Sequence, residues 1–537
     1  MSIAHPLHRR PALGASCSAA MLLSGILAGP AFAAPPTCDA TLLPLLSVPV
    51  NTTLTGAVPK TSKAGNVAYC EVSGVIGPAP SRIGFSVGLP TKSWNGRFVM
   101  SGDGGFDGTI ALPQDRLAQG YATANSDSGH TQPVANDASW AFNNRVAERN
   151  YGYRAAEQTT RVAKQIIQSF YRNRIAYSYF EGCSTGGRQA LMAAQRDPQA
   201  FDGIVGGSPA HDLTKLAVEQ NWSLRQFLPD HGKPGPGTIS VAQSLALKAA
   251  VLDKCDANDG VKDGLISNPL ACHFKAEEMS CAAGADPKTC LSDAQVKAVQ
   301  NVYDGPSTSW GKSLYPGKPV GSEAGWQFWL LPPLAYQGGF TFSFMNYLFF
   351  PTDPGPAPGY NWFNFNFDTD PPQGRQMAEI LDAVDPDLSE FRRHGGKFIL
   401  YHGWGDGLIG AQRTVQYYES VLDEFHSRRK TENTIRLFLA PGMDHCGAFG
   451  SGLSGWDRLA PLVEWVEKGK APERIVASQT LPDKSVRTRP LCPYPQEARW
   501  TGKGSTDEAA NFVCARPAKE DEDNGDDRRD DRDRDHE

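Results

Sequence analysis

The stretch EGCSTGGR, residues 181–188, decides the fold that this sequence predicts. It contains the pattern G-x-S-x-G, with Ser184 at the centre. In α/β-hydrolases this pattern forms a strained turn between a strand and a helix, and the turn exposes the serine at the top of the sheet. Residues 175–180 before it are β-branched and aromatic, as in a strand, and residues 184–196 after it suit a helix that ends at Asp197-Pro198. The order of strand, turn and helix predicts an α/β-hydrolase core with Ser184 as its nucleophile.

A second motif, far downstream, matches the first. Residues 444–446 read DHC, so His445 stands next to Cys446 as Ser184 stands next to Cys183. Serine is a poor nucleophile until a base takes its proton, and histidine commonly serves as that base. A disulfide between the two cysteines would fix the approach of Ser184 to His445 covalently. The G-x-S-x-G pattern alone occurs by chance in many chains and a lone histidine is usually structural, so the flanking cysteines make this pair specific.

A buried acid must hold such a histidine in the right tautomer. Asp406 follows a predicted strand at residues 397–402 and precedes His445, which gives the chain order Ser, Asp, His of α/β-hydrolases. His445 itself follows a predicted strand at residues 434–439. Asp444 is the alternative acid, but a residue adjacent to a histidine rarely reaches the Nδ1 of that histidine. We therefore expect Asp406 to be the acid.

An acyl-transfer site also needs two backbone N–H groups aimed at the developing negative charge. Thr185, directly after the expected nucleophile, should supply one of them. The glycine-rich loop 102–105 follows a predicted strand at residues 97–101 and should supply the other, from Gly104 or Gly105. The sequence does not separate these two glycines, and a simple tight turn is the alternative for the loop.

The N-terminus has the pattern of a secretory signal peptide over residues 1–33. Arg9 and Arg10 precede a mostly apolar run at residues 19–27, and Ala31-Phe32-Ala33 is a small-x-small cleavage site. No other apolar run is long enough to span a bilayer, and an uncleaved anchor is the alternative. The net charge of −6 becomes more negative without the two arginines, which argues against nucleic acid or an anionic membrane as a partner. We expect a secreted or periplasmic protein.

Of the eleven cysteines, all but Cys17 follow the expected cleavage site. An even number in an exported chain indicates disulfides, and zinc ligation is disfavoured because no CxxC pair occurs. The sequence alone cannot choose among the possible pairings. Short loops suggest three pairs, which are Cys255 with Cys272, Cys281 with Cys290 and Cys492 with Cys514. These leave Cys38, Cys70 and the two cysteines beside the expected site.

The composition predicts a discontinuous hydrolase domain over residues 34–213 and 392–515. Residues 214–391 break the alternation of strands and helices and are rich in Pro, Gly, aromatic residues and cysteine, as expected of an inserted lid domain. Most lid aromatics should form the lid core, and a minority could line a slot for a planar aromatic acyl group. Residues 516–537 are almost wholly charged toward their end, which predicts a disordered tail.

Within the expected lid, residues 256–265 read DANDGVKDGL. The carboxylates of Asp256, Asp259 and Asp263 lie close in sequence and suit a hard cation that prefers oxygen ligands. The loop is not an EF-hand, because no glutamate stands at the twelfth position from any of these aspartates. A polar Asx-turn loop without a metal is the alternative. A cation here would stabilise the fold and take no part in catalysis.

Taken together, the motifs resemble the tannase/feruloyl esterase family of secreted α/β-hydrolases, in which a Cys-Ser, Asp and His-Cys arrangement defines the active site. The resemblance extends from about Cys38 to about Cys514 and includes WNGRF at 94–98, GDGGF at 102–106, and AQR at 194–196 followed by FDGI at 201–204. It implies an α/β-hydrolase core with a large lid and no organic cofactor. It also implies five disulfides, namely the three short-loop pairs, Cys38 with Cys70, and Cys183 with Cys446. Finally, it implies a structural calcium ion held by the side chains of Asp256, Asp259 and Asp263 and by the carbonyls of Val261 and Leu265.

The function expected from these residues is hydrolysis of esters of phenolic or other aromatic acids, through an acyl-enzyme on Ser184. Feruloyl esters, galloyl esters and mono-hydroxyethyl terephthalate all suit the same chemistry, and the ester can be attached to a plant polysaccharide or polyphenol. A terephthalate mono-ester carries a carboxylate that favours a cationic pocket, yet residues 319–374 contain no Lys or Arg.

Two other classes of function remain open at this stage. One is a calcium-stabilised binding protein that keeps the fold without activity, and the intact set of Ser184, Asp406 and His445 argues against it. The other is a different serine acyl-hydrolase, such as a peptidase or a lipase, which would cleave amides or long-chain esters with the same serine.

Overall fold

The computed structural model describes residues 36–516 except residues 81, 107, 231, 357 and 358. The expected signal peptide and nearly all of the expected charged tail therefore lie outside the described residues. The described residues from Thr37 to Arg516 form one compact unit. In the part of the chain that is described, no helix is long and apolar enough to cross a membrane.

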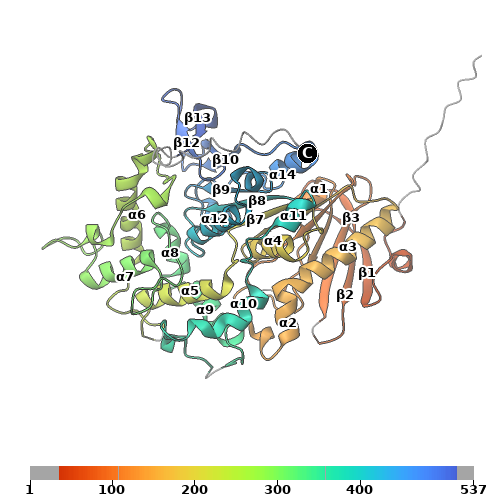
Figure 1. Ribbon diagram of the computed structural model, residues 1–537, viewed down its shortest axis with the longest axis horizontal. Helices are drawn as coiled ribbons and strands as arrows, with labels where there is room; N and C mark the ends of the chain where they lie inside the picture. Colours follow the sequence, from red (N-terminus) through yellow and green to blue (C-terminus); the bar gives the residue numbers. More distant parts are fainter. Residues whose placement is uncertain (1–35, 81, 107, 231, 357–358, 517–537) are drawn as a thin grey trace, which may run out of the picture. The chain divides into compact units, whose positions relative to one another are not determined.

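A nine-stranded sheet forms the centre of the described structure, in the order β1-β2-β3-β5-β4-β6-β7-β8-β9 (Figure 1). The first three strands and β5 pair antiparallel, and all pairs from β5 to β9 are parallel. The strands are β1 (Thr52–Thr61), β2 (Ala68–Ile76), β3 (Ile83–Pro90), β4 (Arg97–Ser101), β5 (Ala122–Ser126), β6 (Tyr177–Cys183), β7 (Gly203–Gly207), β8 (Lys397–Gly403) and β9 (Ile435–Ala440).

The parallel strands are buried on both faces, as their apolar composition requires. In β6, Phe180 belongs to one hydrophobic cluster and Tyr179 to another on the opposite face. Helices α3 (Ala155–Tyr171), α4 (Thr185–Arg196) and α12 (Gln412–Phe425) contribute to the first cluster, and α14 (Ala460–Lys468) contributes to the second. Two helical layers therefore enclose the sheet, which is the α/β-hydrolase architecture that the sequence predicts.

The local predictions differ from the structure mainly at strand ends. Strand β6 was expected at residues 175–180, but it continues to Cys183 because Gly182 and Cys183 pair with Gly206 and Gly207 of β7. Helix α4 ends at Arg196, directly before Asp197-Pro198, as expected. The nucleophile turn is therefore held between two paired strand ends and the start of a helix.

The segment expected to be a lid, residues 214–391, contributes none of the described strands of the large sheet. Its helices form a third hydrophobic cluster, which also takes in Phe106, Tyr151 and the neighbouring Leu408 and Ile409 from the rest of the chain. Figure 1 shows these helices gathered together, from yellow to blue-green. They are α5 (Leu213–Phe227), α6 (Val241–Cys255), α7 (Asp293–Asp304), α8 (Glu323–Trp329), α9 (Gln337–Tyr347) and α10 (Arg375–Leu381). The last helix of the segment, α11 (Ser389–Arg393), lies beside α4 and contributes Phe391 to the first cluster. The division into a catalytic domain and a lid domain stays a prediction.

Shorter elements complete the described chain. They are helices α1 (Gln114–Ala118), α2 (Arg145–Arg149) and α13 (Arg428–Glu432), with the hairpin of β10 (Ile475–Thr480) and β11 (Val486–Leu491) and the pair of β12 (Glu497–Trp500) and β13 (Phe512–Ala515).

The close contact between α4 and β7 gives a test of this packing. A Cβ atom added at Gly187 would lie 2.3 Å from the carbonyl oxygen of Gly207 and 3.0 Å from the Cα of Pro209, and neither backbone atom can rotate away. We expect Gly187→Ala to lower the free energy of unfolding by about 1–3 kcal/mol in urea titrations.

The matched control is Gly338→Ala in α9, where an added Cβ meets nothing within 4 Å. This variant should be neutral or more stable by up to about 1 kcal/mol, because alanine is the better helix former. Equal stability of the two variants would contradict the packing of α4 on β7.

Candidate active site

Ser184 occupies the turn between β6 and α4 with φ +63° and ψ −119°, a conformation that residues with side chains rarely adopt. Glycines on both sides allow the sharp turn. A Cβ atom added at Gly182 would lie 2.6 Å from the carbonyl carbon of Gly186. The Ser184 N–H donates to the carbonyl of Gly207, and the side chain is partly exposed. The sequence thus positions a serine hydroxyl above the sheet at the N-terminus of a helix.

His445 and Asp406 meet above the ends of β8 and β9. The Nδ1 atom of His445 lies 2.8 Å from Oδ2 of Asp406. Asp406 is fully buried, and its Oδ1 accepts hydrogen bonds from the N–H groups of Leu408 at 3.0 Å and Ile409 at 2.8 Å. The loop after β8 therefore wraps around its own carboxylate and presents one oxygen to His445.

His402 is a site residue that the sequence analysis missed. It lies in β8, is fully buried, and places its Nε2 atom 3.2 Å from Oδ2 of Asp406. Its position four residues before Asp406 was the available signal, but only the turn of the chain after β8 brings the two side chains together.

The pKa values of the pair are shifted in opposite directions. Burial alone would raise the pKa of Asp406, but the charge of His445 and the hydrogen bonds from His402 and His445 hold it well below its usual range. For His445, burial lowers the pKa, and the charge and hydrogen bond of Asp406 overcome this and raise it above its ordinary 6.5. Asp406 therefore stays ionised and favours a proton on the imidazole.

Asp444, the alternative acid, contacts backbone and lid groups instead. Its Oδ1 accepts from the N–H of His445 at 2.7 Å and from the N–H of Gly407 at 3.0 Å. The indole Nε1 of Trp329, in α8, lies 3.4 Å from both carboxylate oxygens. Burial first, and then the charge of Asp406, raise the pKa of Asp444. Asp444 thus connects the histidine loop, the Asp406 loop and α8.

A disulfide joins Cys183 to Cys446 and so links the neighbours of Ser184 and His445. Cys446 has φ +55°, and the loop turns sharply after the histidine. The structure contains the five pairs that the family resemblance implies, and the others are Cys38 with Cys70, Cys255 with Cys272, Cys281 with Cys290 and Cys492 with Cys514.

The glycine-rich loop lies against the first turn of α4. The N–H of Gly186 donates to the carbonyl of Asp103 at 2.9 Å, and the Thr185 hydroxyl donates to the carbonyl of Gly105 at 2.8 Å. Gly105 has φ +52°, and a Cβ there would lie 2.3 Å from the carbonyl oxygen of Ala135. As the first residue of α4, Thr185 has an N–H group with no intrahelical acceptor. The structure therefore brings Thr185 and the loop of Gly104 and Gly105 together beside Ser184.

Aromatic side chains connect His445 to this loop. The rings of Trp329 and His445 meet edge to face, with centroids 5.8 Å apart. From Trp329 the ring contacts continue through Tyr336 and Phe340 to Phe106, at centroid distances of 6.2, 5.6 and 5.4 Å. Trp329, Tyr336 and Phe340 come from the segment expected to be a lid, and the sequence alone could not single them out.

The expected calcium loop is hydrogen-bonded by protein groups. The carboxylate of Asp256 accepts from the N–H groups of Asp263 and Gly264, and that of Asp259 accepts from Val261 N–H and from the Ser267 hydroxyl. These contacts are those of an Asx-turn loop.

The carboxylate of Asp263 meets a cation of the protein itself. It pairs with Arg489, and a second guanidinium nitrogen, from Arg487, lies 3.9 Å away. Among the described residues, no group of three or more His, Cys, Asp or Glu side chains is arranged to hold a metal ion. As placed, Asp263 does not fit a calcium ligand, and the calcium site stays a prediction.

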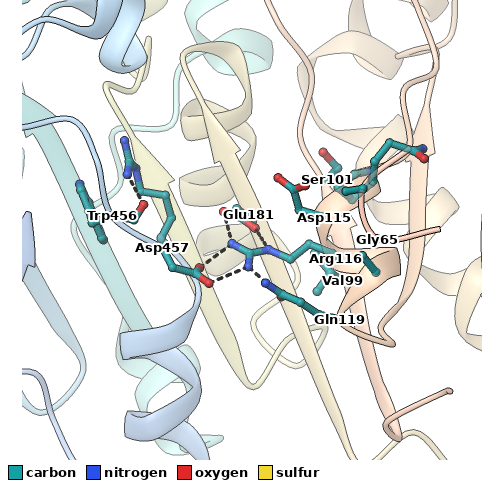
Figure 2. Close-up of a pocket in the computed structure, with 14 residues that line it drawn as sticks. Gly65, Val99, Ser101, Asp115, Arg116, Gln119, Glu181, Trp456 and Asp457 are labelled. Atoms are coloured by element: carbon teal, nitrogen blue, oxygen red, sulfur yellow. Dashed lines mark hydrogen bonds and ion pairs between the residues drawn. The ribbon is translucent and has the colours of Figure 1, made fainter. Parts of the chain in front are cut away.

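A cavity of about 690 Å³ lies beside the N-terminal side of the nucleophile turn (Figure 2). Figure 2 shows the Arg116 side chain pointing between Glu181 and Asp457, with Gln119 alongside. Nε of Arg116 donates to Glu181, one terminal nitrogen donates to Gln119 and Asp457, and the other donates to Glu181 and Asp457, at 2.8–3.1 Å. Arg116 therefore offers no free cation to a ligand. It ties β6, three residues before Ser184, to the segment that follows the histidine loop.

The chain is similar to known esterases in sequence and in structure. The sequence model of the family described as Tannase and feruloyl esterase matches residues 70–515. The chain is 37% identical to an uncharacterized esterase of Xanthomonas campestris pv. campestris, over 83% of this chain and 84% of that protein. It is 33% identical to the mono(2-hydroxyethyl) terephthalate hydrolase of Piscinibacter sakaiensis, over 86% of this chain and 87% of that protein. The crystal structure of feruloyl esterase B from Aspergillus oryzae matches with a TM-score of 0.79 and 26% identity, over 89% of this chain and 99% of that one.

The bridge between Cys183 and Cys446 should contribute more stability than a short-range bridge. It spans a sequence separation of 263, whereas the bridge between Cys281 and Cys290 spans 9. In the chain-entropy account these loops correspond to about 5.5 and about 2.5 kcal/mol. We expect replacement of Cys183 and Cys446 by alanine to lower the unfolding midpoint in urea more than replacement of Cys281 and Cys290. An equal or smaller loss for the first pair would count against this account.

Proposed function

Because this chain belongs to the tannase and feruloyl esterase family of carboxylic ester hydrolases, we propose that it is an exported serine esterase that cleaves esters of aromatic carboxylic acids. The observation that carries the proposal is the continuous connection from Ser184 to the acid. The Cys183–Cys446 disulfide joins the serine turn to the histidine loop, and His445 donates from Nδ1 to the buried Asp406. Export is supported by the ten described cysteines, all of which are paired, and by the signal-like N-terminal sequence.

In the proposed reaction, the Ser184 oxygen attacks the ester carbonyl carbon, and His445 Nε2 takes the hydroxyl proton. Asp406 holds the Nδ1–H of His445 and stabilises the imidazolium. The carbonyl oxygen becomes an oxyanion, which the N–H of Thr185 and that of Gly104 or Gly105 would stabilise. The ester C–O bond then breaks, the alcohol leaves with the proton from His445, and the acyl group stays on Ser184. A water molecule, deprotonated by His445, then attacks the acyl carbon; the bond to the Ser184 oxygen breaks, the free acid leaves, and His445 returns the proton to the serine oxygen.

The preference for an aromatic acyl group rests on the ring contacts from Trp329 to Phe106 near His445. A neutral or phenolic acyl group is favoured over one that carries a carboxylate. Lys318, the last cation before residues 319–374, is buried and donates to Glu219 at 2.9 Å and to the carbonyl of Leu408 at 2.6 Å. The similarity to the mono(2-hydroxyethyl) terephthalate hydrolase keeps that ester as the second candidate substrate. The phenolic ester can be free or attached to a plant polysaccharide or polyphenol.

The proposal is tested by following release of acid from methyl ferulate, methyl gallate and mono(2-hydroxyethyl) terephthalate. We expect the purified protein to prefer an ester of a phenolic acid, methyl ferulate or methyl gallate, over the terephthalate ester. Ser184→Ala should lower kcat/KM by at least about 10³-fold, because the nucleophile is lost. The wild-type unfolding midpoint should be kept by this variant, since the change is one partly exposed oxygen.

A preference for the terephthalate ester would overturn the proposed substrate class, but it would leave the proposed serine mechanism unchanged. Turnover that persists in Ser184→Ala would refute the mechanism. No turnover of these three esters, of a long-chain ester or of a peptide amide would favour the calcium-stabilised binding protein instead.

Calcium remains our proposal for the loop of Asp256, Asp259 and Asp263, with the carbonyls of Val261 and Leu265. Binding would require Asp263 to leave Arg489 and would stabilise the folded state by mass action. We expect the thermal midpoint to rise with millimolar calcium over that in EDTA, and to lose this rise in Asp259→Asn. Identical midpoints in calcium and EDTA would instead establish the metal-free Asx-turn loop.

A further inference from the structure

We propose that His402 is a positioning residue that donates a hydrogen bond from Nε2 to Asp406, and that it thereby sets how strongly Asp406 holds the proton of His445. This inference rests on the roles proposed above for Asp406 and His445. His402 is fully buried in β8 and lies against Asp406, so its effect on the reaction would pass through that carboxylate.

The geometry around the carboxylate defines four donors. Oδ1 receives the N–H groups of Leu408 and Ile409, and Oδ2 lies 2.8 Å from His445 Nδ1 and 3.2 Å from His402 Nε2. The same Oδ2 atom therefore serves both histidines. A second donor on a carboxylate oxygen makes that oxygen a weaker acceptor for the first donor. His402 and His445 therefore compete for Oδ2.

The position of the His402 proton follows from its neighbours. Nε2 faces two acceptors, which are Oδ2 of Asp406 and the carbonyl oxygen of Ile409 at 2.9 Å. Neither can donate, so Nε2 must carry a proton. Nδ1 lies 2.9 Å from the hydroxyl of Thr414 in α12, which can donate to it. His402 and Thr414 are both fully buried, so solvent does not compete for the ring nitrogens of His402.

Other charged groups act on the same pair and stay constant in the test. Asp444 raises the pKa of His445, and Lys318, whose Nζ atom bonds Glu219, lowers it. The hydrogen bond from His402 contributes to the low pKa of Asp406. Removal of that bond should therefore leave a more basic carboxylate and a more basic His445.

Two substitutions at His402 distinguish the effect of its Nε2–H donor from the effect of the ring's volume. His402→Gln can place an amide N–H where Nε2 lies, and His402→Asn can occupy only the Nδ1 position. The measurement is the pH dependence of kcat/KM, whose acid limb reports the pKa of the general base in the free enzyme. Activity needs neutral His445, so it is lost as the pH falls through that pKa.

We expect the midpoint of the acid limb to move up by about half a unit or more in His402→Asn, and to stay at the wild-type value in His402→Gln. If His402 only filled space, a loosened site would separate His445 from Asp406 and move the midpoint down. An unchanged or lowered midpoint in His402→Asn would therefore overturn the proposal, as would equal upward shifts in both variants.

Two further measurements keep the inference testable on its own. If His402→Asn does not fold, Thr414→Val removes the hydroxyl that orients the ring and should shift the midpoint in the same direction, with Thr414→Ser as the control. Titration of histidine resonances in selectively ¹⁵N-labelled protein reads the pKa of His445 without any substrate. A wild-type protein with no esterase activity would refute the proposed function, and the titration would still decide the role of His402.

Discussion

The covalent bond between Cys183 and Cys446 is the constraint on which the candidate site depends. Ser184 and His445 are separated by about half of the chain, and each lies in a turn with unfavourable backbone dihedrals, at Ser184 itself and at Cys446. Strained turns persist only where surrounding structure holds them. The disulfide joins the two turns directly, and the Arg116 bridge joins Glu181, just before the serine turn, to Asp457 in the segment that follows the histidine loop. With the serine and histidine turns joined in this way, the rest of the fold has only to place Asp406 against His445.

The acid is placed by the loop that follows β8. Lys318, from the segment expected to be a lid, binds the carbonyl of Leu408, while the N–H of Leu408 binds Asp406. Trp329 reaches Asp444, which binds the N–H of Gly407. The residues between β7 and β8 are therefore part of what holds the carboxylate, in addition to any contact with substrate.

Local sequence patterns were sufficient to predict the core of the fold. The turn at Ser184, the strand before it and the helix that ends at Arg196 follow from short-range chemistry of glycine, proline and β-branched residues. The contacts that could not be predicted join distant segments. Arg489 meets Asp263 across more than two hundred residues, and His402 reaches Asp406 only because the loop folds back. Neither contact leaves a periodic pattern in the sequence.

The most direct test of the central claim is covalent trapping of the nucleophile. The intact protein would be treated with an aryl fluorophosphonate and the modified residue located by peptide mass spectrometry. The account predicts a single adduct on Ser184, formed much more slowly in His445→Gln, because the serine is reactive only while the histidine accepts its proton. An adduct on another residue, or labelling of Ser184 at the same rate without His445, would contradict it.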